Sequence, residues 1–251
     1  MRLLIVNPNI SESVSQLIEN EARRTAPEGL ELKVLTAEFG VAYIETRAEA
    51  LVGGYATLQA LAAHHQEYDA AVVAAFGDPG LWAARELFDI PVVGMTESAL
   101  MSAAMLGGKF SIVAISRRIK TWYEETVASY GMLDRLSSIR CLEDKLNNIA
   151  TIQEDHGEQL VALCNQAIQE DGADVIIIAG APLAGLARTV AAQISVPVVD
   201  GVTCAVQQAQ ALVGIGAKAP TAGSFAVPPT KPIKGVPEAL ARLMGRDRMD
   251  A

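Results

Sequence analysis

Cysteines, basic residues and long apolar runs are scarce in this 251-residue sequence, and each shortage excludes a class of protein. The only three cysteines, Cys141, Cys164 and Cys204, are scattered and odd in number, which excludes a disulfide-stapled fold and favours a reducing compartment. Twenty basic against 29 acidic residues leave no basic face for nucleic acid or an anionic membrane. The longest apolar run, residues 175–187, is shorter than the ~20 residues of a membrane span. We therefore expect a cytoplasmic protein without nucleic-acid or membrane partners.

Histidine is equally scarce. His64 and His65 are neighbours at the end of a predicted helix, and His156 stands alone, so no pair has the spacing of metal ligands. The carboxylates do not cluster either, and Gly107-Gly108 before Lys109 lacks the spacing of a phosphate loop and is typical of a turn. We therefore predict no metal site.

Hydrophobic residues, by contrast, make up 51% of the chain, and their spacing is informative. Short runs of branched residues, typical of strands buried on both faces, alternate with longer stretches that have helical periodicity. This alternation predicts a mainly parallel sheet with right-handed crossovers. The predicted strands cover residues 3–7, 32–35, 70–74, 92–93, 111–115, 175–179 and 198–199.

The same pattern occurs twice along the chain. Pro91 and Pro197 each immediately precede a predicted strand and are 106 residues apart, and Ala75 and Ala181 have the same offset. The repeat predicts an α/β fold of two pseudo-symmetric lobes, residues 1–105 and 106–212, each a mainly parallel sheet flanked by helices, with the active-site cleft between them. We expect the proline-rich tail, residues 213–251, to lie over the surface or back across the first lobe.

Candidate binding residues follow from this fold. Ligands of parallel sheets bind beyond the carboxyl ends of the strands, where helix N-termini offer free N–H groups. Small residues in these loops let the backbone approach a small carboxylate or a planar imide. Arg117 could hold a substrate carboxylate, or it could simply begin a solvated helix. The predicted substrate-binding residues are Asn9, Ile44, Ala75, Phe76, Gly77, Ser116, Arg117, Ala181, Pro182 and Leu183.

Several motifs resemble those of the hydantoin racemases, within the aspartate/glutamate racemase superfamily. The most specific are Asn7-Pro8-Asn9 and Phe76-Gly77-Asp78-Pro79-Gly80-Leu81; Tyr43-Ile44-Glu45 is another. The resemblance extends from residue 2 to about residue 234. It implies two pseudo-symmetric α/β lobes, no cofactor, a small-molecule site between the lobes, and a homo-oligomer.

The resemblance also points to two positions at which this sequence differs. That family moves the substrate proton with two cysteines on opposite faces of the reacting carbon, and their positions fall on Ala75 and Ala181. Because alanine has neither an exchangeable proton nor a lone pair, the two-thiol mechanism cannot operate here. The alanines reflect either engineering or natural divergence. Ala181-Pro182-Leu183-Ala184 stands where the family usually has Cys-Ala-Gly-Met, which favours divergence.

Three residues are candidates to replace the thiols. Asp78 could act as a base, although Asp-Pro-Gly is also ordinary turn and N-cap chemistry. Glu97 follows a strand end and could abstract a proton, or it could answer the dipole of a helix as a first-turn acid. Cys204 could be an activated thiol at a helix N-terminus or a buried small hydrophobe.

We therefore expect a cofactor-independent enzyme that acts on a small cyclic ureide or carboxylate. Its two-cysteine chemistry would be replaced by lyase, hydrolase or carboxylate-mediated proton-transfer chemistry. One alternative is a hydantoin- or allantoin-type racemase in which both thiols have been mutated. Another is a homologue that binds a small ligand without catalysis.

Overall fold

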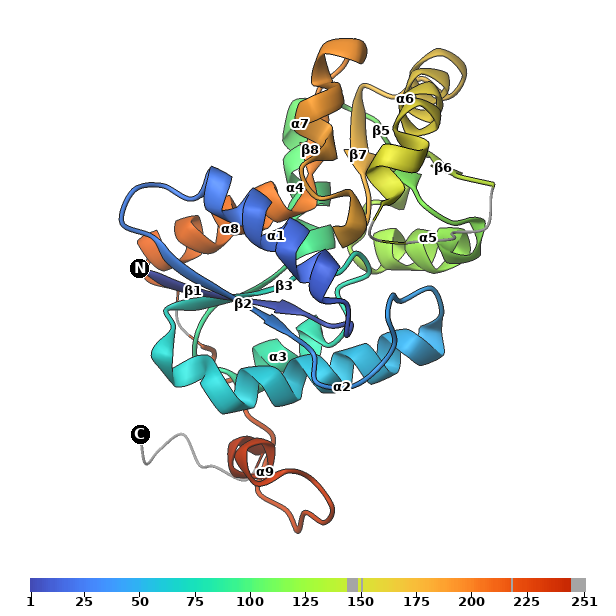
Figure 1. Cartoon of the computed structure of the whole chain (residues 1–251). Helices are drawn as coiled ribbons and strands as arrows, with labels where there is room; N and C mark the ends of the chain where they lie inside the picture. Colours follow the sequence, from blue (N-terminus) through green and yellow to red (C-terminus); the bar gives the residue numbers. More distant parts are fainter. Residues whose placement is uncertain (144–148, 150, 218, 245–251) are drawn as a thin grey trace.

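The computed structural model describes residues 1–143, 149, 151–217 and 219–244, and it divides them into two stacked lobes (Figure 1). The first lobe is a parallel four-stranded sheet in the order β2-β1-β3-β4. Its strands are β1 Arg2–Asn7, β2 Glu31–Thr36, β3 Ala70–Val73 and β4 Val92–Gly94. Its helices are α1 Glu12–Thr25, α2 Arg47–His64, the short η1 His65–Glu67, α3 Leu81–Leu87 and α4 Met95–Leu106.

The second lobe repeats this arrangement. Its sheet is also parallel and has the equivalent order β6-β5-β7-β8. The strands are β5 Phe110–Ala114, β6 Leu136–Cys141, β7 Val175–Ile178 and β8 Val198–Asp200. The helices are η2 Arg117–Ile119, α5 Lys120–Ser129, η3 Leu133–Arg135, α6 Ile152–Asp171, η4 Ala181–Leu183, α7 Leu186–Val190, η5 Ala191–Gln193 and α8 Gly201–Gly214. The predicted fold class is thereby confirmed.

Strand β6 is the element that the sequence did not reveal. It runs Leu-Ser-Ser-Ile-Arg-Cys at the edge of its sheet, and Ile139 is its one fully buried residue. Its polar side chains are paired: Ser138 shares a hydrogen bond with Ser111, and the Arg140 guanidinium donates to Asp171 on α6 at 2.6 Å. An edge strand needs no continuous apolar run, so the hydrophobic pattern could not indicate it.

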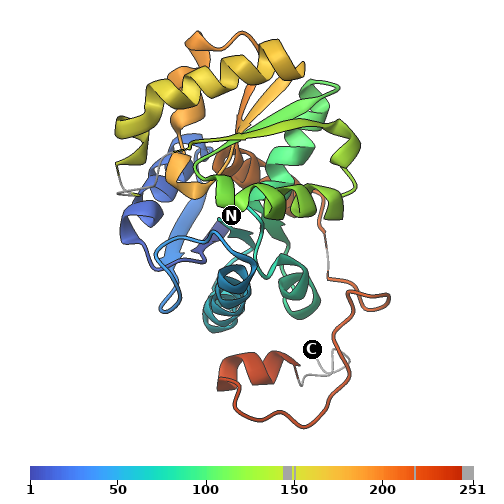
Figure 2. The same ribbon diagram turned by 90° about the vertical axis from the view of Figure 1, so that its right-hand side faces the viewer.

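Each lobe packs one of its helices against the sheet of the other lobe. Helix α8 of the second half packs against α1 and against β3 and β4 of the first, while α4 of the first half packs against β7 and β8. The two helices also pack against each other, and residues of both lobes belong to one hydrophobic cluster. Figure 2 shows the two lobes stacked one above the other, with the C-terminal segment beyond the first lobe. The division at residue 105 stays a prediction, because the lobes share this core.

The C-terminal segment returns to the first lobe. The Phe225 ring stacks on Trp82 with ring centroids 5.8 Å apart, and α9, Glu238–Met244, lies against α2 (Figure 1). Leu240 and Leu243 are buried there in a cluster that includes Leu61. None of the helices in the described ranges is long and apolar enough to cross a membrane.

Candidate active site

Ala75 and Ala181 line the same cavity between the lobes, each just beyond the end of a central strand. The cavity volume is about 40 Å³, enough for one or a few water molecules. Its walls combine strand-end loops of both sheets with the connection that precedes α2. The lining residues are Asn9, Tyr43, Ile44, Glu45, Ala75, Phe76, Ile115, Ile119, Tyr123, Gly180, Ala181 and Pro182.

Six of the ten predicted substrate-binding residues are brought together here: Asn9, Ile44, Ala75, Phe76, Ala181 and Pro182. The other four are absent from this lining. Ser116 accepts a hydrogen bond from the Arg118 N–H at 3.2 Å at the start of η2, and the exposed Arg117 pairs with Glu143 at 3.1 Å. Gly77 lies under Trp122, and Leu183 is buried in the core.

The structure adds lining residues that sequence reasoning did not select. Glu45 was within reach, because Tyr43-Ile44-Glu45 is one of the motifs that carry the family resemblance. Tyr123 lies on α5 next to Trp122. In the structure its ring packs on Phe76 of the other lobe, with centroids 4.6 Å apart. That contact depends on how the lobes meet, which no local pattern predicts.

Unpaired backbone groups give the cavity its binding chemistry. The N–H groups of Ala75, Phe76, Gly180 and Ala181 have no hydrogen-bond partner in the part of the chain that the structure describes. Gly180 has a φ of 108°, a conformation that glycine adopts readily and other residues rarely do. Two free donors therefore stand at each of two symmetric strand ends, where they can bind carbonyl or carboxylate oxygens.

Asp78 does not line the cavity. Its carboxylate is buried and accepts hydrogen bonds from the N–H groups of Thr96 and Glu97, both at 2.8 Å, which caps the N-terminus of α4. The Tyr130 hydroxyl at the end of α5 donates a third, at 2.6 Å. Burial raises the pKa of Asp78 to about 6, although these hydrogen bonds oppose the rise. Asp78 therefore caps α4 and, through Tyr130, links the first lobe to the second.

Glu97 is also outside the cavity lining. It lies in the first turn of α4, and its carboxylate forms a two-pronged ion pair with Arg85 of α3, one contact measuring 2.9 Å. Arg85 donates in addition to the carbonyl of Val92 at 2.9 Å. The Glu97 carboxylate is therefore paired with Arg85 and lies outside the cavity lining, so the structure gives no support to the selection of Glu97 as a base.

The Asp/Glu/Hydantoin racemase family matches residues 3–209 of the chain. The chain belongs to this family. The hydantoin racemase of Pseudomonas sp. (strain NS671) is 32% identical over 243 residues, covering 96% of this chain and 98% of that protein. The hydantoin racemase of Paenarthrobacter aurescens is 33% identical over 235 residues, or 92% and 99% of the two chains. The structure of allantoin racemase from Klebsiella pneumoniae matches with a TM-score of 0.91 at 30% identity, covering 96% of this chain and 98% of that one.

None of the cysteines lines the cavity of this family member. Burial raises the pKa of all three thiols, to about 11 for Cys141 and about 12 for Cys164. Cys164 is fully buried, whereas Cys141 is half-buried in β6. Cys204 lies in α8 with its thiol held protonated by burial rather than activated. The described residues also contain no group of three or more His, Cys, Asp or Glu that could hold a metal ion.

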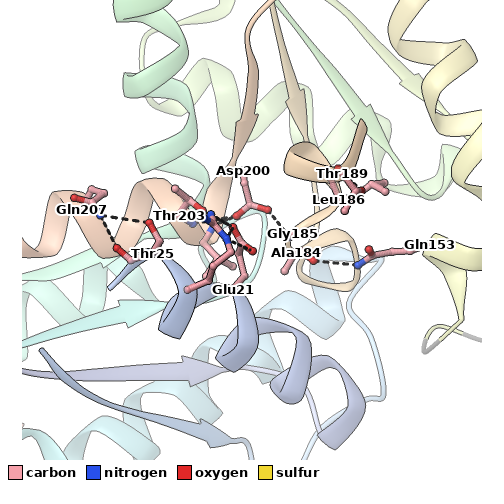
Figure 3. Close-up of polar contacts among 12 residues, drawn as sticks. Glu21, Thr25, Gln153, Ala184, Gly185, Leu186, Thr189, Asp200, Thr203 and Gln207 are labelled. Carbon is pink, nitrogen blue, oxygen red and sulfur yellow. Dashed lines mark hydrogen bonds and ion pairs between the residues drawn. The ribbon is translucent and has the colours of Figure 1, made fainter. Parts of the chain in front are cut away.

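A polar network holds the second-lobe wall of the site in place (Figure 3). Asp200 accepts from the Gly185 N–H at 2.7 Å, just after η4, and from the Val202 and Thr203 N–H groups of α8. The Thr203 hydroxyl donates to the buried Glu21 of α1 at 2.8 Å, which ties the lobes together. Gln153 of α6 donates to the carbonyls of Pro182 and Ala184. The loop that carries Ala181 is thus held by Asp200 at the end of β8 and by Gln153 of α6.

Proposed function

We propose that this racemase-family protein binds a small cyclic ureide or carboxylate in the cavity and acts on it without a cofactor. The observation that carries the proposal is the convergence of Ala75 and Ala181 on one cavity from opposite lobes. In the family's mechanism a proton leaves one face of the reacting carbon and returns to the other. With methyl groups on both walls, that two-thiol exchange is replaced by lysis, hydrolysis or carboxylate-mediated proton transfer.

The free N–H groups support catalysis of this kind. All three reactions place negative charge on a carbonyl or carboxylate oxygen as the transition state forms. Preorganised backbone donors stabilise such charge, and one donor of this type is worth roughly 3 kcal/mol in enzymes where it has been removed. The lining also contains one carboxylate, Glu45, which can accept a hydrogen bond from a ureide N–H or accept a proton.

The size of the cavity indicates how a ligand enters. A volume of about 40 Å³ is too small for a five-membered ring with substituents, so binding requires the lining loops to move apart. The connection before α2, which carries Tyr43, Ile44 and Glu45, contributes three of the lining residues from one segment. We expect this segment to move outward when a ligand enters.

The first test is ligand binding followed by restoration of the thiols. Calorimetry with hydantoin and allantoin should show binding to the wild-type chain. The double variant Ala75→Cys/Ala181→Cys should then exchange the α-proton of a bound 5-alkyl hydantoin in heavy water and invert its configuration. Failure of the wild type to bind any ureide or small carboxylate would refute the proposal. Binding with no turnover of any kind would instead identify a non-catalytic homologue.

We also propose a cytoplasmic homo-oligomer. Three large apolar side chains of the described surface, Leu51, Met105 and Ile215, are each more than three-quarters exposed and so are available for contact with a partner chain. Light scattering coupled to gel filtration should give a mass that is a multiple of 26.5 kDa. A monomer at micromolar concentration would refute this part of the proposal.

A further inference from the structure

The charges that line the cavity are few and of one sign. Among the twelve lining residues there is one carboxylate, Glu45, and there is no lysine, arginine or histidine. The remaining polar side chains are those of Asn9, Tyr43 and Tyr123. A group that removes a proton from a substrate must therefore come from these four side chains or from outside the cavity.

Glu45 differs from the other carboxylates near the lobe boundary in having no partner. Asp78, Glu97, Asp200 and Glu21 all engage N–H groups, hydroxyls or arginine. No hydrogen bond or ion pair to the Glu45 carboxylate is found within the described residues. Its backbone is nevertheless fixed, because the Glu45 N–H donates to Glu49 at 2.8 Å beside the capping box that begins α2. An anchored main chain thus presents a side chain that is free to engage a ligand.

The other polar side chains are unsuited to accept a proton. Burial, followed by nearby negative charges that include Glu45, raises the pKa of Tyr123 far above its ordinary value. Burial likewise raises the pKa of Tyr43, so both phenols are neutral at physiological pH. Asn9 uses its side-chain oxygen to accept from the Ser11 N–H at 2.9 Å and from the Asn7 amide at 3.1 Å. Glu45 remains as the base within the cavity.

We propose that Glu45 is the catalytic base of this site and that it works alone. This rests on the proposed function, because it requires a ligand with an acidic C–H next to a carbonyl in the cavity. The C–H bond breaks, the proton moves to a carboxylate oxygen of Glu45, and the electron pair moves onto the carbonyl oxygen to give an enolate. The free N–H groups of the strand-end loops stabilise that oxygen. The proton, or a deuteron exchanged onto Glu45 from solvent, then returns to carbon.

A single base has a stereochemical consequence that two thiols do not have. Glu45 removes the proton from one face of the carbon and returns it to that face, while the walls at Ala75 and Ala181 offer only methyl groups. The site therefore exchanges the substrate proton with solvent faster than it inverts the carbon. The activity assigned to the chain is stereoretentive proton exchange, and racemisation is a minor outcome.

The experiment follows an optically pure 5-alkyl hydantoin in heavy water, with deuterium incorporation read by NMR and inversion by circular dichroism. The wild type should incorporate deuterium at least tenfold faster than it inverts. Glu45→Gln should lower the exchange rate at least 100-fold, the typical contribution of a positioned base, with ligand binding by calorimetry changed less than about fivefold. Glu38→Gln, an exposed carboxylate in the same connection, is the matched control and should exchange like the wild type. Glu45→Asp, which keeps a shortened carboxylate, should retain measurable exchange.

The outcomes separate this inference from the function on which it rests. A wild type that binds no ureide or small carboxylate refutes both, and one that binds hydantoin without exchanging its proton overturns only the inference. A wild type that binds and exchanges, together with a Glu45→Gln variant that exchanges equally fast, overturns Glu45 as the base and leaves the proposed function standing. Inversion as fast as exchange in the wild type overturns the single-base mechanism. If Glu45→Gln does not fold, Glu45→Ala takes its place, and exchange by that variant as fast as by the wild type overturns the role of Glu45.

Discussion

In both lobes a carboxylate caps the N-terminus of an equivalent helix, α4 or α8. The two carboxylates come from different positions relative to the helix that they cap. In the second lobe Asp200 is itself the N-cap of α8 and also reaches back to the loop after η4. In the first lobe the N-cap of α4 is Gly94, and Asp78 supplies the carboxylate from the loop after β3. A Cβ atom at Gly94 would lie 2.3 Å from the Asp78 Cγ, so the two solutions exclude each other.

The two lobes therefore share the same helix-capping hydrogen bonds, although the residues that supply the carboxylate are not equivalent in the sequence. Each helix begins against one buried carboxylate that also touches the loop carrying a cavity wall. Only the first-lobe carboxylate itself is bonded across the lobe boundary, because Tyr130, the C-cap of α5, donates to Asp78. The loop that carries Ala181 meets the first lobe by packing instead, because η4 lies against α1.

Gly94→Asp tests whether the two caps exclude each other, and it should have the largest effect. The new side chain meets the Asp78 carboxylate in a buried site, so we expect a loss of about 4 kcal/mol in the free energy of unfolding. The double variant Asp78→Gly/Gly94→Asp reproduces the second-lobe arrangement and should recover at least about 2 kcal/mol of that loss, as measured by urea unfolding. Additive losses in the double variant would contradict the equivalence of the caps.

Removing each capping carboxylate separately should show which of the two caps contributes more to the free energy of unfolding. Asp78→Ala leaves two backbone N–H groups and the Tyr130 hydroxyl without an acceptor, and it places alanine at a φ of 47°, so we expect a loss of about 3 kcal/mol. Asp200→Ala removes an ordinary N-cap with one extra contact and should cost about 2 kcal/mol. Both values come from chemical denaturation, and the reverse ranking would mean that Tyr130 contributes nothing.

The pH dependence of stability should also reveal the buried first-lobe cap. Burial raises the pKa of Asp78 from 3.8 to about 6, so the folded state holds its proton longer than the unfolded chain as the pH rises. Wild-type stability should therefore fall relative to Asp78→Asn between about pH 4 and pH 6, by about 3 kcal/mol in total. Unfolding curves at several pH values check this, and a difference that does not change with pH would show that Asp78 stays ionised.

The smallest effect is expected where the second lobe contacts α1. Thr203→Val removes the hydroxyl that donates to Glu21 while keeping the shape of the side chain. Because Arg24 still pairs with Glu21, we expect a loss of only about 1 kcal/mol. In the Thr203→Val background, Glu21→Gln also removes the ion pair with Arg24, so a further loss is expected there. A loss above about 3 kcal/mol for Thr203→Val would mean that the hydroxyl supports more than this contact.

The sequence predicted the large features because they depend on repeating local patterns. The common offset of Ala75 and Ala181 placed both residues at strand ends, and the structure puts both in one cavity. The polar edge strand β6 was not predicted because its stability comes from pairing with β5 and α6 rather than from its own apolar residues. The partners of Asp78 and Glu97 could not be predicted from the sequence either, because they lie 12 to 52 residues away along the chain.

The exchange of α4 and α8 between the lobes governs how the protein can be made. Val72, Ala74 and Val93 of the first lobe share one hydrophobic cluster with Ala205 and Ala209 of α8. While the chain is being synthesised, this face stays uncovered until the ribosome has passed residue 214, more than a hundred residues after the first sheet is complete. The first half is therefore a nascent intermediate that is prone to aggregation, and we expect both halves to complete their folding in one late, cooperative step.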